Sequence, residues 1–188
     1  MNPTDDAPRV ALRARQGAGA RYDAPSAPAG DLLLARRGTA YFARKLGELT
    51  DAGLAEPSLR AGDSKARVVA TVGYHARSLA ERLARLRVGA DQPPALSEDA
   101  RQAVIAQGAT LPARALRSLV HHAAFHLDVE WRDLTDADWE MRVPLVGGET
   151  VLACATPPLR ARAVWQAALD LGNGGRLADV PAKIRAAP

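Results

Sequence analysis

The stretch RARAVWQAALDLGNGGRLADVP, residues 160–181, predicts the last helix of a helical bundle and so indicates the fold class. Its first half carries apolar residues at helical spacing and has no helix breaker. Trp165 and Leu169 are four residues apart, so they share one face that can pack the bundle, and Gly172 ends the helix. The Pro-Pro pair at 157–158 is typical of a first helical turn.

The segments before this helix predict a mostly helical domain with one small β element. In EMRVPLVGGETVLACA, a Gly-Gly turn separates two short strand-like runs, which indicates a β hairpin before the last helix. The long connections between helices favour a bundle with crossover connections. We therefore expect an all-α four-helix bundle with a small β hairpin. The other helical segments are expected at 31–50, 64–88, 97–107 and 112–132.

The composition limits the function classes. Of 188 residues, 47% are apolar and only 4% are aromatic, which suits helix packing better than a sheet sandwich. The single cysteine, Cys154, excludes an internal disulfide and indicates a reducing compartment. We find neither a long apolar run nor the apolar core of a signal peptide. We therefore expect a cytoplasmic protein without a membrane partner.

The net charge of +4 comes mostly from arginines mixed with acidic residues. This mixture is typical of a solvated surface. A nucleic-acid-binding face would need a basic stripe with aromatic residues or a known motif, and the sequence shows neither. An arginine cluster for a small anionic ligand stays open, since the guanidinium fork matches a carboxylate or phosphate.

Four stretches, in their order and spacing, resemble one family: VVATVGYHARSLAERL, RQAVIAQGATLPARALRSL, HLDVEWRDLTDADWEMRV and RARAVWQAALDLGNGGRLADVP. The chain is similar to the N-terminal domain of mycothiol-dependent maleylpyruvate isomerase, which belongs to the DinB-like four-helix bundles. The similarity covers about residues 31–183, and we expect a DinB-like bundle at 30–174 and a tail at 175–188. Residues 1–29 are rich in Pro, Ala, Gly, Asp and Arg without apolar periodicity, so we expect a disordered arm there.

The resemblance implies a divalent metal, usually zinc, held by two His and one Glu, with mycothiol as the thiol cofactor. The positions of these ligands correspond to Thr71, Ala163 and Ala167 in this chain. Alanine has no lone pair to donate and threonine is a poor zinc ligand. We therefore expect a divergent member with no metal and no cofactor. The family's Gly-Trp is Gly62-Asp63 here, and its further C-terminal domain is expected to be absent.

Three residues are candidates for acid–base chemistry: His75, His126 and Glu130. His122, His126 and Glu130 follow one another at intervals of four, which places them on one helix face. They could form a relocated metal site, a His–Glu acid–base pair, or a structural polar seam in which Glu130 orients His126. His75 could act as a base in the vacated pocket or be a packed histidine. His121 is expected to be exposed.

Four arginines are candidates for binding a small anion: Arg67, Arg77, Arg160 and Arg162. The alternative for each is ordinary surface solvation. Cys154 lies in an apolar run without a basic neighbour, so we expect a buried, inert thiol.

The missing ligands favour an accessory function. We expect a metal-free, degenerate homologue that forms a homo- or hetero-oligomer with a related protein and serves an active enzyme in a metabolic or biosynthetic pathway. The first alternative is a metal-independent enzyme of isomerase or lyase type, acting on a small anionic metabolite in the vacated pocket. The second is an ordinary thiol-dependent maleylpyruvate isomerase. Fold alone does not decide among them.

Overall fold

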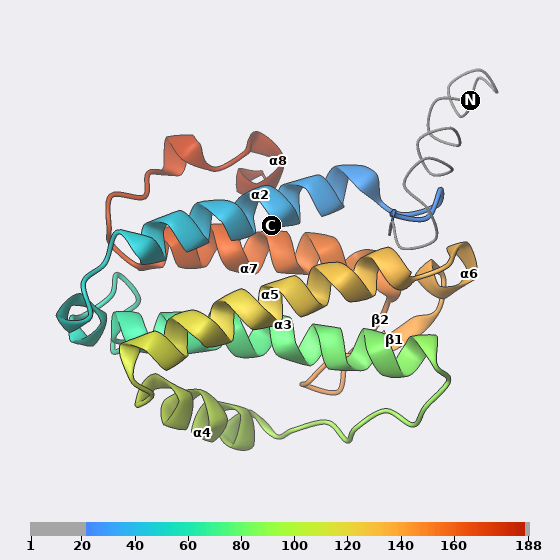
Figure 1. Cartoon of the computed structure of the whole chain (residues 1–188), viewed down its shortest axis with the longest axis horizontal. Helices are drawn as coiled ribbons and strands as arrows, with labels where there is room; N and C mark the ends of the chain where they lie inside the picture. The colour runs from blue at the N-terminus through green and yellow to red at the C-terminus, as the bar shows by residue number, and fades with distance from the viewer. Residues whose placement is uncertain (1–21, 187–188) are drawn as a thin grey trace.

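A computed structural model describes residues 22–186, and four long helices form its body (Figure 1). The connections carry short helices and one hairpin, so the prediction of an all-α bundle with a small β hairpin is confirmed. The long helices are α2 (Ala29–Gly47), α3 (Lys65–Arg87), α5 (Ala113–Asp133) and α7 (Thr156–Asp170). The shorter helices are η1 (Ala52–Ala55), α4 (Glu98–Ala109), α6 (Asp136–Trp139), η2 (Ala153–Ala155), η3 (Leu177–Asp179) and α8 (Ala182–Arg185).

The bundle contains the crossover that its loop lengths predict. Helices α3 and α5 run in the same direction, and so do α2 and α7, while the two pairs are antiparallel to each other (Figure 1). Contacts at the two ends agree with this arrangement. Arg36, early in α2, pairs with Asp128, late in α5, and Arg117, early in α5, donates to the Leu46 carbonyl, late in α2. Because α3 and α5 are parallel, the chain must return between them, and the loop before α4 runs back along the bundle (Figure 1).

The contact between α2 and α7 explains the role of Trp165 in the last helix. Trp165 is 4% exposed and its indole Nε1 donates a hydrogen bond to the Leu34 carbonyl at 3.1 Å. Gly38 faces it, and a Cβ at this position would lie only 2.6 Å from Cγ2 of Val164. Two helix backbones can approach this closely only because one residue has no side chain. Trp165 therefore packs the bundle, as its position predicts.

The hairpin consists of β1 (Arg142–Pro144) and β2 (Thr150–Leu152), paired antiparallel with Val143 opposite Val151. Gly148 has a φ of 88°, a left-handed conformation that glycine adopts without strain. Val143 is fully buried, so the hairpin closes the end of the bundle at which α7 begins.

Two segments outside the expected limits of 30–174 contact the bundle. The main-chain N–H of Ser26 donates to Asp136 at 2.8 Å, and the Tyr41 hydroxyl donates to Asp179 at 2.7 Å. The C-terminal segment with η3 and α8 thus lies beside α2 (Figure 1). Most of the expected arm, residues 1–21, is outside the described residues.

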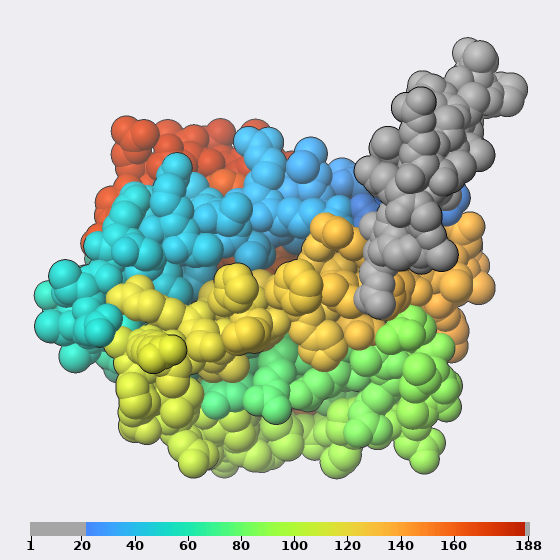
Figure 2. Space-filling view, in the orientation of Figure 1, coloured from blue at the N-terminus to red at the C-terminus, as the bar shows by residue number. Residues whose placement is uncertain are grey.

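One broad face of the molecule is shared by two helices. Figure 2 shows α2, in blue to cyan, and α5, in yellow to orange, side by side across it. None of the helices in the described part of the chain is long and apolar enough to cross a membrane.

Candidate functional site

The expected ligand positions lie on facing parts of α3 and α7. Arg160 of α7 contacts His75 of α3, and these helices are antiparallel. Thr71 lies one helical turn before His75 on α3, and Ala163 and Ala167 lie one and two turns after Arg160 on α7. Because the two helices are antiparallel, all three positions lie on the same side of the Arg160–His75 contact, at neighbouring levels between the helices.

The donors at this level do not fit a zinc ion. The Thr71 hydroxyl donates to the Arg67 carbonyl in its own helix at 2.8 Å, and Ala167 is 2% exposed within the core. Zinc sites in proteins use Cys, His, Asp or Glu donors, usually three or four of them. Among residues 22–186, no group of three or more such side chains is arranged to hold a metal ion.

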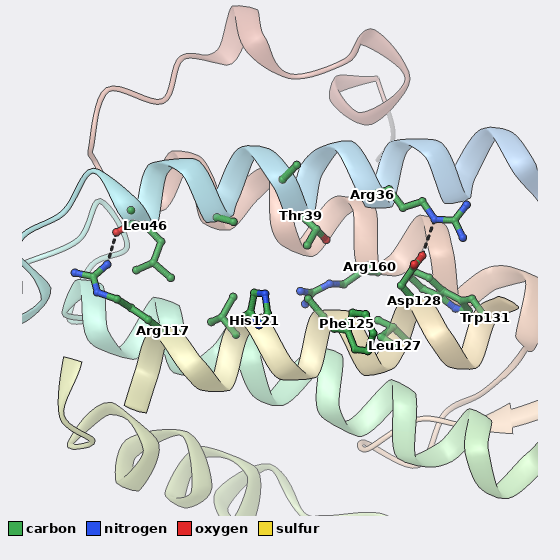
Figure 3. A pocket seen from close by; sticks show the side chains of 15 residues that line it. Arg36, Thr39, Leu46, Arg117, His121, Phe125, Leu127, Asp128, Trp131 and Arg160 are labelled. Carbon is green, nitrogen blue, oxygen red and sulfur yellow. Dashed lines mark hydrogen bonds and ion pairs between the residues drawn. The ribbon is translucent and has the colours of Figure 1, made fainter. Parts of the chain in front are cut away.

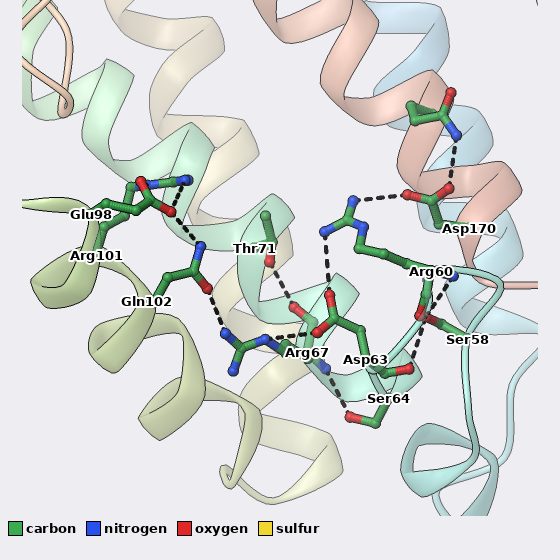
Figure 4. Close-up of polar contacts among 11 residues, drawn as sticks. Ser58, Arg60, Asp63, Ser64, Arg67, Thr71, Glu98, Arg101, Gln102 and Asp170 are labelled. Carbon is green, nitrogen blue, oxygen red and sulfur yellow. Dashed lines mark hydrogen bonds and ion pairs between the residues drawn. The ribbon is translucent and has the colours of Figure 1, made fainter.

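A chain of ion pairs closes the end of the bundle next to this level (Figure 4). Arg60 pairs with Asp170 of α7 at 2.8 Å and with Asp63 at 3.6 Å. Asp63 pairs in turn with Arg67 of α3 at 2.9 Å, and Arg67 also bonds Gln102 of α4. These ion pairs link the last turn of α7 to the start of α3. They therefore connect the same two helices that a bound metal would join.

Arg160 makes a second set of contacts between α7 and α3, deeper in the bundle. Its side chain is 1% exposed and Nη1 donates to the Val72 carbonyl at 2.8 Å. Nη1 also lies 3.4 Å from Nδ1 of His75. A guanidinium only donates, so Nδ1 of His75 is the acceptor and the imidazole is neutral, with its proton on Nε2.

The environment of His75 keeps this imidazole neutral. Burial, together with the positive charges of Arg160 and Arg101, lowers the pKa of His75 from 6.5 to about 3. A group with so low a pKa is a weak general base at neutral pH. The structure therefore supports the packed, hydrogen-bonded role for His75 better than the catalytic one.

His75 is expected to make the protein sensitive to acid. Between pH 6.5 and about 3 the unfolded chain binds a proton on this residue and the folded chain does not. The free energy of unfolding should therefore fall with decreasing pH, by up to about 1.4 kcal/mol per pH unit from this residue. Denaturant unfolding of His75→Asn at pH 7 and pH 5 should show a flatter dependence than the natural protein. His121→Asn, at an exposed site, should keep the natural slope. Equal slopes in all three proteins would contradict the assignment.

His126 and Glu130 form the pair that their spacing predicts, but at a different place from His75. Nε2 of His126 lies 3.2 Å from Oε1 of Glu130, whose other oxygen accepts from Arg87 at 3.2 Å. Arg87 is the last residue of α3, three turns beyond His75. Among the described residues, no hydrogen bond or ion pair joins the His126–Glu130 pair to His75, and Glu130 already contacts both His126 and Arg87.

The other candidates are distributed over the surface. Arg77 is exposed and pairs with Glu81 at 2.8 Å, Arg162 is exposed, and His121 is exposed as expected. Cys154 is partly buried against the core. Arg160 is therefore the one anion-binding candidate with a buried side chain.

Sequence reasoning missed a cavity on the face shared by α2 and α5. It has a volume of about 490 Å³, and the Arg160 guanidinium points into it from α7 (Figure 3). Thr71, Ala163 and Ala167 do not line it, so it is separate from the expected metal level. No local sequence signal reveals such a space, because its walls come from three helices. The lining comprises Arg36, Thr39, Ala40, Ala43, Leu46, Gly47, Arg117, Val120, His121, Ala124, Phe125, Leu127, Asp128, Trp131 and Arg160.

Comparisons with known proteins agree with the resemblance. The family model of the mycothiol maleylpyruvate isomerase N-terminal domain matches residues 35–172. The crystal structure of mycothiol-dependent maleylpyruvate isomerase is similar with a TM-score of 0.76, and that of its histidine-to-alanine mutant with 0.77. Each is 35% identical and the match covers 82% of this chain, but only 64% of the solved chain. A search among curated proteins gave no match.

Proposed function

This chain belongs to the mycothiol maleylpyruvate isomerase N-terminal domain family, and we propose that it is a metal-free, non-catalytic member that serves as an accessory subunit of a related, active enzyme. The observation that carries the proposal is the replacement of all three expected ligands by Thr71, Ala163 and Ala167. A single lost ligand could be compensated by a neighbour, but the described residues offer no alternative donor set.

The ion-pair network between α3 and α7 supports this proposal. Asp170, Arg60, Asp63 and Arg67 tie the two helices next to the ligand level. Such ties let the bundle keep its form without a metal, so the ligands can be lost when catalysis is carried out by another chain. The cytoplasm, as a reducing compartment, suits a protein with one free cysteine.

The metal-independent enzyme is the second candidate, and the His126–Glu130 contact at 3.2 Å favours it. The carboxylate could orient the imidazole for proton transfer. The low pKa of His75, about 3, counts against this residue as the base. A His126-dependent turnover of a small anionic substrate would support this candidate over the accessory subunit.

Metal content and turnover test the proposal together. The protein purified from zinc-supplemented cells is expected to hold less than about 0.1 zinc per chain by elemental analysis, because no suitable donor set is present. Alone, it should not isomerise maleylpyruvate with mycothiol, with or without added zinc. Co-expression with family members encoded nearby should yield a complex by size-exclusion chromatography.

The absence of metal, the absence of catalysis and the accessory role can each be contradicted by a different result. Stoichiometric zinc with isomerase activity would establish the ordinary thiol-dependent enzyme and overturn the proposal. Turnover without metal, lost in His126→Ala, would establish the metal-independent enzyme. A protein that is inactive, metal-free and alone in every co-expression would overturn the accessory role.

A further inference from the structure

The cavity between α2 and α5 contains one buried cation with free hydrogen-bond donors. Nε and Nη2 of Arg160 have no hydrogen-bond partner among residues 22–186, although the side chain is 1% exposed. These two N–H groups lie on the same edge of the guanidinium and point in parallel, which is the edge that binds both oxygens of a carboxylate. Nη1, on the opposite side, is already used by Val72 and His75.

The other charged groups around the cavity have partners. Arg36 bonds Asp128 at 2.7 Å and Asp23 at 2.6 Å. Arg117 donates to the Leu46 and Leu49 carbonyls at the end of α2. Arg160 therefore stands out as the cavity cation whose charge is not balanced by an acidic side chain.

The remainder of the cavity is mostly apolar. Its walls come from small and aliphatic residues of the two helices, with the Phe125 ring, 68% exposed, on the α5 side of the mouth (Figure 3). An exposed aromatic ring beside an apolar cavity is suited to cover a ligand. A purely polar anion such as phosphate would leave these walls without contacts.

We propose that the α2–α5 cavity binds a small monocarboxylate with an apolar body, whose carboxylate accepts two hydrogen bonds from Nε and Nη2 of Arg160. The apolar body lies along the walls formed by Ala40, Ala43, Val120 and Ala124, and Phe125 covers it. One carboxylate is expected, because one guanidinium edge is free. Since the guanidinium is 1% exposed, the side chains above it shift when the carboxylate enters.

The site does not depend on the accessory role or on the absence of zinc, because none of the expected ligand positions lines the cavity. A result that contradicts the metal-free accessory role therefore leaves the cavity proposal intact, and the reverse also holds.

Octanoate and octanamide form a matched pair of probes, because they share the apolar chain and differ in charge. Trp131 lines the cavity and is 3% exposed, so its fluorescence can report binding, with titration calorimetry as the second measurement. Octanoate is expected to bind at least about tenfold more tightly than octanamide, as two charge-assisted hydrogen bonds distinguish them. Inorganic phosphate at millimolar concentration should not compete.

Substitutions test the position of the site. Arg160→Met should remove the preference for octanoate over octanamide, and Arg160→Lys should reduce it, since lysine lacks the two-donor edge. Arg37→Met, at an exposed position of α2 that does not line the cavity, should change the preference less than about twofold. Equal binding of the two probes to the natural protein, no binding of either at millimolar concentration, or a preference that survives Arg160→Met would overturn the proposal.

Discussion

A zinc site is expected to appear in this protein when three substitutions, Thr71→His, Ala163→Glu and Ala167→His, are combined. The contacts of Arg160 with His75 and of Arg60 with Asp170 fix the relative position of α3 and α7 on both sides of this level. Glu and His four residues apart then lie on one face of α7, opposite the new histidine of α3. Three such donors with one water complete a tetrahedral zinc coordination.

The effect on stability should be large and dependent on metal. At a free zinc concentration of 100 times the dissociation constant, the free energy of unfolding should rise by about 2.7 kcal/mol. For a domain of this size that corresponds to an increase in Tm of roughly 5–10 °C. Thermal unfolding with zinc and with EDTA measures it, and the visible spectrum of the cobalt form reports tetrahedral geometry. The natural protein should show no difference between the two conditions.

Crowding is the main risk for this variant, because Ala167 is 2% exposed. A larger side chain there is expected to lower the stability of the metal-free form by about 1–3 kcal/mol. The double variant Ala163→Glu, Ala167→His carries the same crowding at Ala167 and lacks only the new histidine on α3, so it should bind zinc at least about tenfold more weakly than the triple variant. A folded triple variant that binds no better than the double one would show that Thr71 is not at the ligand level.

The helices could be predicted because their signals are local. Apolar spacing gives α3, α5 and α7, and the two glycines at 147–148 give the hairpin turn. The contact between His126 and Glu130 is also local, since residues four apart on a helix are neighbours. Its catalytic use stays a prediction, because spacing fixes a contact and not a reaction.

The features that distinguish this protein depend on residues far apart in the chain. Arg60 and Asp170 are 110 positions apart, and Arg160 and Val72 are 88 apart. No spacing rule connects them, because their contact results from the packing of α7 against α3. The sequence suggested Arg160 as an anion-binding residue, but its burial and its free donor edge follow only from the assembled bundle.

Replacing Arg160 by methionine is expected to stabilise the protein. Burial without an acidic partner lowers the pKa of Arg160 from its ordinary value to about 9, because the charged form loses its hydration. Methionine has a similar length and no charge, so it can occupy the same space. Exchanging a buried ion pair for apolar side chains commonly leaves stability unchanged or raises it by roughly 1–4 kcal/mol, and Arg160 has no acidic partner to offset its desolvation. The lost hydrogen bonds to Val72 and His75 each offset up to about 1 kcal/mol of this gain.

Denaturant unfolding at pH 7 measures the change, and Arg37→Met, at an exposed position of α2, is the control expected to lie within about 0.5 kcal/mol of the natural protein. A stabilised Arg160→Met that has also lost its octanoate preference would mean that the arginine is kept for its ligand, at the expense of the fold. Strong destabilisation would instead make Arg160 a structural crosslink of α7 and α3, and its unpaired edge would then need a partner from solvent or from another chain. The sign of this one difference in unfolding free energy therefore separates a binding residue from a structural one.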